Sequence, residues 1–395
     1  TVASAAAALA PSVGALIAAR AVQGAGGAAL MPLSLTILDD AVPGDRRGLA
    51  LGMWSGVAGL GVALGPLVGG AVVEGGSWQW IFWLNVPIGV ALVPLALRGL
   101  RESHGPDGAL DLPGLALAGL GLLGITFGIV RSTALGWGSA TVLASVLAGL
   151  VVLGAFVAWE RRAAEPMLPM RLFASRGFSA TNGVSLAMFF GAFGSVFLLA
   201  QYFQVAQGHG PLEAGLMTLP WTAMPIFVAP VAGVLSDRIG ARPLMAAGLA
   251  LQAGGIFWLS RDASPAQSYG SVVVPLIMGG VGMALVFAPS ANAVLGSVPA
   301  ALAGRASGAM NAIREVGGVL GISVLSSVFA ANGSFRTPLE FVDGLRAAVP
   351  VGAAVLAAGA LIALLVPDTR RAGAEAEAAR GREEPIARAA AELAA

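Results

Sequence analysis

The 395-residue chain contains no cysteine and no lysine, and all 22 of its basic side chains are arginines. Without cysteine it can form neither a disulfide nor a thiolate metal site. Without lysine it lacks the residue that a Walker A phosphate loop requires, so ATP hydrolysis of that kind is excluded. The two histidines, His104 and His209, fall in predicted loops, and we therefore expect no metal centre and no resident cofactor.

Charge is also scarce. Only 11% of the residues are charged and 57% are hydrophobic, whereas a soluble domain carries about 25% charged residues. Most of the chain must therefore lie in lipid. The net charge of +1 gives no reason to expect nucleic acid as a partner, and no nucleotide site is indicated.

Apolar runs separated by charged or Gly/Pro-rich breaks predict an all-α, polytopic membrane protein, since a membrane-spanning helix needs about 20 apolar residues. A short apolar stub at 1–9 reads as the end of a helix that begins before Thr1. The eleven predicted spans lie near residues 12–37, 48–73, 79–97, 112–131, 140–159, 178–203, 213–235, 243–260, 271–296, 306–331 and 347–366.

Arginines are distributed unequally between the two sets of loops, and this predicts the orientation. One set carries eleven arginines and the other carries four, at Arg131, Arg261, Arg336 and Arg346. The richer set should face the cytoplasm, together with the tail at 367–395. We expect a multi-pass protein of the plasma membrane with a cytoplasmic C-terminus.

The sequence repeats itself at an offset of 256 residues, since Gly61, Leu64 and Gly65 match Gly317, Leu320 and Gly321. Duplicated halves are typical of secondary transporters. The offset predicts two six-helix halves with an extra helix pair between them, and it places about 80 residues, two helices and part of a third, before Thr1. The predicted division is an N-terminal bundle at 1–97, a linker with the extra pair at 98–177, a C-terminal bundle at 178–366 and a tail.

Gly61, Gly65 and Gly69 recur every four residues and line one face of a helix, beside Pro66 and Gly70. A face without side chains allows a neighbouring helix to come close in lipid, and membrane helices tolerate proline. The pattern G-x-x-x-G-P-x-x-G-G resembles the fifth-helix antiporter signature of the major facilitator superfamily. We predict that this face is the seam along which the two halves slide; simple helix packing is the alternative.

Arg20 lies inside a predicted span, where a charge costs at least about 2.5–3.5 kcal/mol and is a functional candidate by default. The alternative is an arginine that snorkels to water from the helix end. The pattern R-x-x-x-G-x-G-x-A, from Arg20 to Ala28, resembles the fourth-helix signature of the same superfamily. The resemblance implies a role for Arg20 in proton transfer.

A loop between two predicted helices contains Gly233, Asp237, Arg238, Gly240 and Arg242. It resembles the loop motif G-x-L-a-D-R-x-G-R-r of the superfamily in its second-half copy, which implies a cytoplasmic latch between conformations. A turn that follows the positive-inside rule explains most of the same charge.

Arg314 and Glu315 form the only adjacent pair of opposite charge within a predicted span. Neighbouring residues point about 100° apart on a helix, so the two side chains should not pair face to face. They are candidates for proton coupling, with two charges at a wet interface as the alternative. Asn311 lies one turn earlier and could share the site.

The segment from Trp78 to Gly89, WQWIFWLNVPIG, resembles the sixth-helix signature of the fourteen-helix drug:proton antiporters. This family resemblance extends over essentially the whole chain. It implies a proton-coupled exporter of amphipathic small molecules that works by alternating access as a monomer, with H⁺ as the coupling ion and no enzymatic activity. Candidate cavity residues are Gln23, Met217, Trp221, Phe227 and Asn311.

Two other functions remain open. One is export of a single metabolite, such as a self-made antibiotic or an amino acid, which would use the same fold and motifs. The other is a membrane receptor or enzyme, for which the sequence offers neither a catalytic cluster nor a soluble sensing domain.

Overall fold

The computed structural model describes residues 1–42, 47–100, 111–299 and 302–367, and for part of 29–63, Thr133 and Asp237 it describes the backbone alone. Every regular element in these ranges is helical, which confirms the predicted all-α class. The principal helices are α1 (Val2–Ala8), α2 (Val13–Ala41), α3 (Arg47–Gly75), α4 (Trp80–Trp83), α5 (Asn85–Gly99), α6 (Leu112–Leu135), α7 (Ala140–Glu160), α8 (Arg176–Gln201), α9 (Pro211–Met217), α10 (Leu219–Thr222), α11 (Met224–Ile239), α12 (Ala241–Asp262), α13 (Tyr269–Gly296), α14 (Ala303–Asn332) and α15 (Pro338–Ala363).

A helix or a run of helices lies at each of the eleven predicted spans. Within the described part of the chain, nine helical segments are long and apolar enough to cross a membrane. The predicted spans near 12–37 and 48–73 correspond to α2 and α3, each 29 residues long. At 1.5 Å per residue, a helix of that length exceeds the roughly 30 Å of bilayer hydrocarbon.

Two predicted spans differ from the observed helices for local reasons. The span near 213–235 is divided into α9, α10 and α11, because Pro220 and Pro225 lack the N–H that would continue the helix and instead lie in the first turn of the next piece. The last helix begins well before residue 347, since Thr337 Oγ1 accepts a hydrogen bond from Glu340 N at 3.2 Å and caps a polar first turn.

The helix boundaries follow the offset seen in the sequence. Helix α13 begins at Tyr269, 256 residues after Val13, the first residue of α2, and the described part of α3, from Arg47, corresponds at the same offset to α14 from Ala303. The α2–α3 pair and the α13–α14 pair are therefore equivalent elements of two repeated halves.

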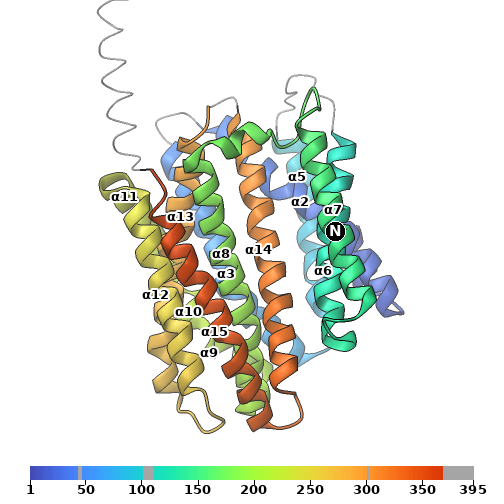
Figure 1. Ribbon diagram of the computed structural model, residues 1–395, viewed down its shortest axis with the longest axis vertical. Coiled ribbons are helices and arrows are strands. Elements are labelled where there is room, and N and C mark those ends of the chain that lie inside the picture. Colours follow the sequence, from blue (N-terminus) through green and yellow to red (C-terminus); the bar gives the residue numbers. More distant parts are fainter. Residues whose placement is uncertain (43–46, 101–110, 300–301, 368–395) are drawn as a thin grey trace, which may run out of the picture.

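Helices α8, α12, α13, α14 and α15 pack into one bundle in the described part of the chain (Figure 1). Close approach of backbones builds this bundle: a Cβ on Gly194 of α8 would stand 2.8 Å from the carbonyl oxygen of Gly321 on α14. Small residues at helix contacts are the usual means of packing in lipid, where apolar side chains gain little by leaving the hydrocarbon.

The extra pair, α6 and α7, stands as a hairpin beside α14 (Figure 1). Within the hairpin, a Cβ on Gly149 would stand 2.7 Å from the carbonyl oxygen of Gly121. Ser132 on α6 and Ser327 on α14 are linked by a buried hydrogen bond of 3.1 Å between their hydroxyls. The hairpin is therefore attached directly to the C-terminal bundle.

Candidate functional site

Helix α3 of the first half packs against α9, the first piece of the divided span in the second half. A Cβ on Gly70 would stand 2.9 Å from Leu212 Cα, and a Cβ on Gly215 would stand 2.5 Å from the carbonyl oxygen of Pro66. Real Cβ atoms essentially never approach other atoms so closely, so only glycine fits at these two positions. This backbone-to-backbone contact joins the two halves, and we call it the α3–α9 contact.

Glu74, at the end of α3, extends the α3–α9 contact. Its Oε2 accepts a hydrogen bond from Leu212 N at 2.9 Å, which is one of the first-turn N–H groups that have no partner inside a helix. A carboxylate at this position is also stabilised by the positive end of the helix dipole. None of the sequence motifs includes Glu74, because its partner, Leu212, lies 138 residues further along the chain, in the other half.

Of the residues in the predicted seam, Pro66 and Gly70 lie at the α3–α9 contact, and the role of the whole stretch as a sliding seam stays a prediction. A Cβ on Gly61, Gly65 or Gly69 would have no described atom within 4 Å, so the glycine stripe does not face α9. Pro66 and Gly70, one residue further along, carry the contact. One residue turns a helix by about 100°, and the contact surface is rotated by that step.

The second copy of the repeat shows what this glycine spacing does in α14. In the second half, the equivalents of Gly61 and Gly65 are Gly317 and Gly321, and both pack against α8 within one bundle. A Cβ on Gly317 would stand 2.6 Å from the carbonyl oxygen of Leu186, and one on Gly321 would stand 2.8 Å from the carbonyl carbon of Phe190. In α14 the four-residue glycine spacing thus serves packing inside a half.

Arg20 lies on α2 in a short polar chain. Its Nη1 donates to Gln23 Oε1 at 2.6 Å, and Gln23 Nε2 donates to Ser4 Oγ on α1 at 2.8 Å. The guanidinium carbon also lies 5.7 Å from the centre of the Phe82 ring, within cation–π range. The Arg20 side chain is exposed, whereas Ser4 is buried. Its assignment to proton transfer stays a prediction.

Arg314 on α14 is buried, with 5% of its surface exposed. Its Nη2 donates to Ser290 Oγ at 2.9 Å and to the Phe287 carbonyl at 3.3 Å, and its guanidinium carbon lies 4.6 Å from the Phe287 ring centre and 5.6 Å from that of Phe189. Its Nε has no hydrogen-bond partner among the described residues. Such a cation is costly to bury and is a functional candidate.

Glu315 is exposed and Asn311 is half-buried. Arg314 and Glu315 thus differ sharply in burial, as neighbours on a helix should when they point in different directions. Of this predicted group, the structure encloses Arg314 alone. Ser290 and Phe287, which accept hydrogen bonds from Arg314, come from α13. Spacing along the sequence could not identify them as partners of Arg314.

In the predicted latch loop, Gly240 is the one residue between the end of α11 and the start of α12. Its φ of +88° is a left-handed conformation that favours glycine, and its N–H donates to the Ser236 carbonyl at 2.9 Å. Arg238 and Arg242 are exposed, and Gly233 lies within α11 with open space around it. The side chain of Asp237 lies outside the described residues.

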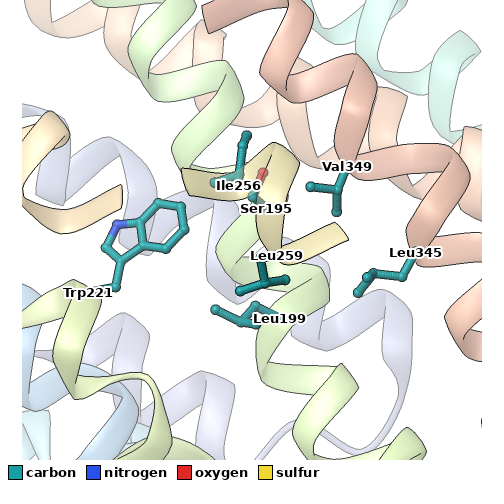
Figure 2. A pocket seen from close by; sticks show the side chains of 7 residues that line it. All are labelled: Ser195, Leu199, Trp221, Ile256, Leu259, Leu345 and Val349. Atoms are coloured by element: carbon teal, nitrogen blue, oxygen red, sulfur yellow. The ribbon is translucent and has the colours of Figure 1, made fainter. Parts of the chain in front are cut away.

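The predicted cavity residues are not brought together. Trp221 is 1% exposed and Phe227 is 67% exposed, while Met217 uses its carbonyl to accept from Tyr269 Oη at 3.3 Å. Trp221 alone of this set borders a small pocket of about 10 Å³, which is too small for a drug-sized ligand. Its lining comes entirely from the second half, as Figure 2 shows: Ser195, Leu199, Trp221, Ile256, Leu259, Leu345 and Val349.

Duplicated helical halves of membrane-spanning length, joined by a close glycine contact, define a polytopic transporter-type membrane fold. The comparison with family models agrees: the model of the Major Facilitator Superfamily matches residues 1–203 and 183–393. The chain belongs to this superfamily, as the motifs predict.

Several curated relatives are similar to the chain. It is 32% identical to the tetracenomycin C resistance and export protein of Streptomyces glaucescens and 34% identical to the multidrug resistance protein Stp of Mycobacterium tuberculosis, and each match covers 84% of this chain and 62% of the relative. It is 38% identical to the cephamycin export protein CmcT of Amycolatopsis lactamdurans, over 84% of this chain and 69% of that protein. The chain thus spans about three fifths of the length of the first two.

Among solved structures, a mutant of the peptide transporter POT superposes with a TM-score of 0.61 at 18% identity, covering 93% of this chain and 78% of that one. At this identity the likeness establishes the fold alone.

Proposed function

We propose that the protein is a secondary transporter that exports amphipathic small molecules in exchange for protons by alternating access. The α3–α9 contact carries the proposal, because it joins the two repeated halves through backbone atoms and one carboxylate hydrogen bond. A contact between backbones that is held by a carboxylate hydrogen bond can separate when the halves rock. The names of the relatives, which are resistance and export proteins, support export as the direction.

In this proposal the end of α3 that carries Glu74 faces outward, because the loops poor in arginine lie on that side. The protein is then a monomer in the plasma membrane with its C-terminus in the cytoplasm, and it is not an enzyme. Arg20 and Arg314, with Glu315 beside it, are the candidate groups for proton coupling. These residues are candidates because a charged side chain within a membrane span is costly and is usually functional.

The experiment measures transport by inverted membrane vesicles that contain the protein. An imposed pH gradient should drive uptake of a cationic dye into the vesicles, and collapse of the gradient should stop it. Dye uptake that survives collapse of the gradient contradicts proton coupling.

Export of one specific antibiotic is the second candidate function. It is favoured by relatives that are named for tetracenomycin C, cephamycin and methylenomycin A. A panel of unrelated dyes and antibiotics in the same vesicles separates the two: competition among many compounds supports a multidrug exporter, and transport of a single class supports the specific one.

A further inference from the structure

The α6–α7 hairpin ends in two acidic side chains that the transport proposal does not use. Asp111 immediately precedes α6, and Glu160 is the last residue of α7. Glu160 is 3% exposed, and acidic side chains are almost never buried to this degree unless they are paired. The end of this hairpin therefore needs a physical explanation.

Each acid uses one oxygen in ordinary hydrogen bonds. Asp111 Oδ1 accepts from Gly114 N and from Trp159 Nε1, both at 2.8 Å. Glu160 Oε2 accepts from Leu168 N at 3.0 Å, in the segment that leads from α7 to α8. These bonds fix both carboxyl groups in place and leave one oxygen on each.

The two remaining oxygens, Asp111 Oδ2 and Glu160 Oε1, are buried and have no partner in the described part of the chain. They face each other across Gly114, since the point where a Cβ on Gly114 would stand lies 2.9 Å from Glu160 Oε1 and 2.7 Å from Asp111 Cγ. Each carboxyl group acts electrostatically on the other, and the Met167 N–H also acts on Asp111. Both oxygens are acceptors, so a hydrogen bond between the two carboxyl groups requires a proton on one of them.

Two adjacent carboxylates cannot both be ionised without strong repulsion, and pairs of this kind share one proton. The N–H of Gly114 donates to Asp111 and lowers the pKa of that carboxyl, as does Trp159 to a lesser extent. Asp111 is thus the member that stays ionised, and the proton belongs on Glu160.

We propose that Glu160 is a proton-binding site, and that its carboxylic acid donates a hydrogen bond from Oε1 to Asp111 Oδ2. The pair closes the end of the α6–α7 hairpin and, through Glu160 Oε2, holds Leu168 in place. Among the described residues, Arg305 at the start of α14 also acts on Glu160, through a weaker attraction. Arg161 and Arg162 follow in the chain and are exposed.

The pair gives the hairpin a pH dependence of defined sign. While the proton is bound, the closed arrangement is stable. As the pH rises and the proton leaves, the two adjacent anions repel and push Glu160 away from Asp111. The bond from Leu168 N is then lost through this movement, although an ionised acceptor by itself would strengthen it. Alkaline pH should therefore release the segment between α7 and α8. This inference does not depend on transport, because the protonation state is measured directly.

The test uses the full chain in lipid nanodiscs, followed by infrared absorption and amide hydrogen exchange. The C=O band of a buried carboxylic acid should be present near neutral pH and disappear at alkaline pH. Glu160→Gln should remove this band at every pH, while Asp343→Asn, a change at an exposed acid on α15, should leave it intact. In the wild type, protection of the Leu168 amide should fall roughly tenfold between these conditions beyond the intrinsic pH effect, as expected for the loss of one hydrogen bond.

Glu160→Gln keeps a neutral donor toward Asp111, so Leu168 should stay protected at both pH values. If that variant does not fold, Asp111→Asn provides a second test, since removal of the neighbouring anion should make the carboxylic acid band of Glu160 disappear at a lower pH than in the wild type. A band that is absent from the wild type, or that survives Glu160→Gln, overturns the proposal. Protection of Leu168 that responds to added Ca²⁺ instead of protons overturns it in favour of a cation site.

Discussion

Replacing Gly70 by alanine is the sharpest test of the α3–α9 contact. The new Cβ would stand 2.9 Å from both Leu212 Cα and the Pro211 carbonyl carbon. All of these neighbours are backbone atoms, which cannot rotate away as a side chain can. Helix α3 must therefore move outward, and the 2.9 Å hydrogen bond from Leu212 N to Glu74 Oε2 lengthens with it.

The size of the effect follows from two losses. Overpacking a close contact costs about 1–3 kcal/mol, and a hydrogen bond to a charged group contributes about 1.5–3 kcal/mol. Part of the second loss is recovered, because water can reach the freed groups when the contact opens. A net penalty of about 1–3 kcal/mol shifts an open–closed equilibrium by roughly 5- to 150-fold.

Gly69 supplies the matched control. It is the neighbouring residue on the same helix, and a Cβ at Gly69 would have no described atom within 4 Å. Alanine is favoured over glycine in a helix by about 1 kcal/mol, so Gly69→Ala should be neutral or slightly stabilising. Any general effect of Gly→Ala replacement in α3 appears in both variants and cancels.

The assay exploits the absence of cysteine from the chain. A single cysteine introduced at Leu212 should react slowly with a membrane-impermeant maleimide when the contact is closed. In the Gly70→Ala background it should react several-fold faster, and efflux should fall, while the Gly69→Ala background should match the parent. Equal labelling in the two alanine backgrounds would refute the argument that the contact lies on the Gly70 side of α3.

Three further predictions use the same preparation. Glu74→Gln should keep the shape of the contact but remove its charge from the start of α9, so labelling at Leu212 should rise by about two- to fivefold, corresponding to 0.3–1 kcal/mol; an unchanged rate would show that the charge is irrelevant. Ser290→Ala should leave a buried N–H of Arg314 without its acceptor and lower the stability by about 1–3 kcal/mol in thermal unfolding, whereas Ser297→Ala, whose hydroxyl donates only to a carbonyl on its own helix, should change it little. Arg20→Met should abolish gradient-driven uptake while preserving dye binding, and Arg336→Met, a change at an exposed arginine between α14 and α15, should retain uptake; retained uptake in Arg20→Met would exclude Arg20 from coupling.

The helices were predictable because lipid imposes a simple rule on sequence. A span needs about 20 apolar residues, and every backbone polar group must be satisfied internally. The predicted bounds of the spans are wrong where polar or proline-rich sequence is nevertheless helical. The residues after Thr337 form the first turns of α15 because Thr337 caps them, and Pro220 and Pro225 divide one predicted span into three pieces. Such local capping cannot be read from hydropathy.

The candidate site was predictable in its motifs and less so in its geometry. The sequence identifies Pro66 and Gly70 within the glycine-rich stretch, but their partners, Pro211 and Gly215, lie in another half of the protein. Likewise, the sequence marks Arg314 as unusual, while its partners on α13 depend on how α13 and α14 meet. Chemistry local to one helix can be inferred from spacing; contacts between helices depend on packing that one sequence does not reveal.

The repeat shows that one glycine spacing can serve different contacts in the two halves. In α14, Gly317 and Gly321 bring the helix onto the backbone of α8 within a bundle. In α3, the equivalent Gly61 and Gly65 face open space among the described residues, and the contact with the other half has moved to Pro66 and Gly70. A contact between halves must open during transport, whereas a contact within a half need not.

We therefore expect Gly321→Ala to lower thermal stability, because its Cβ would meet the backbone of Phe190, and Gly70→Ala to change the conformational equilibrium with a smaller loss of stability. The reverse ranking in thermal unfolding would contradict the assignment of α14 to a rigid bundle and of the α3–α9 contact to a separable one.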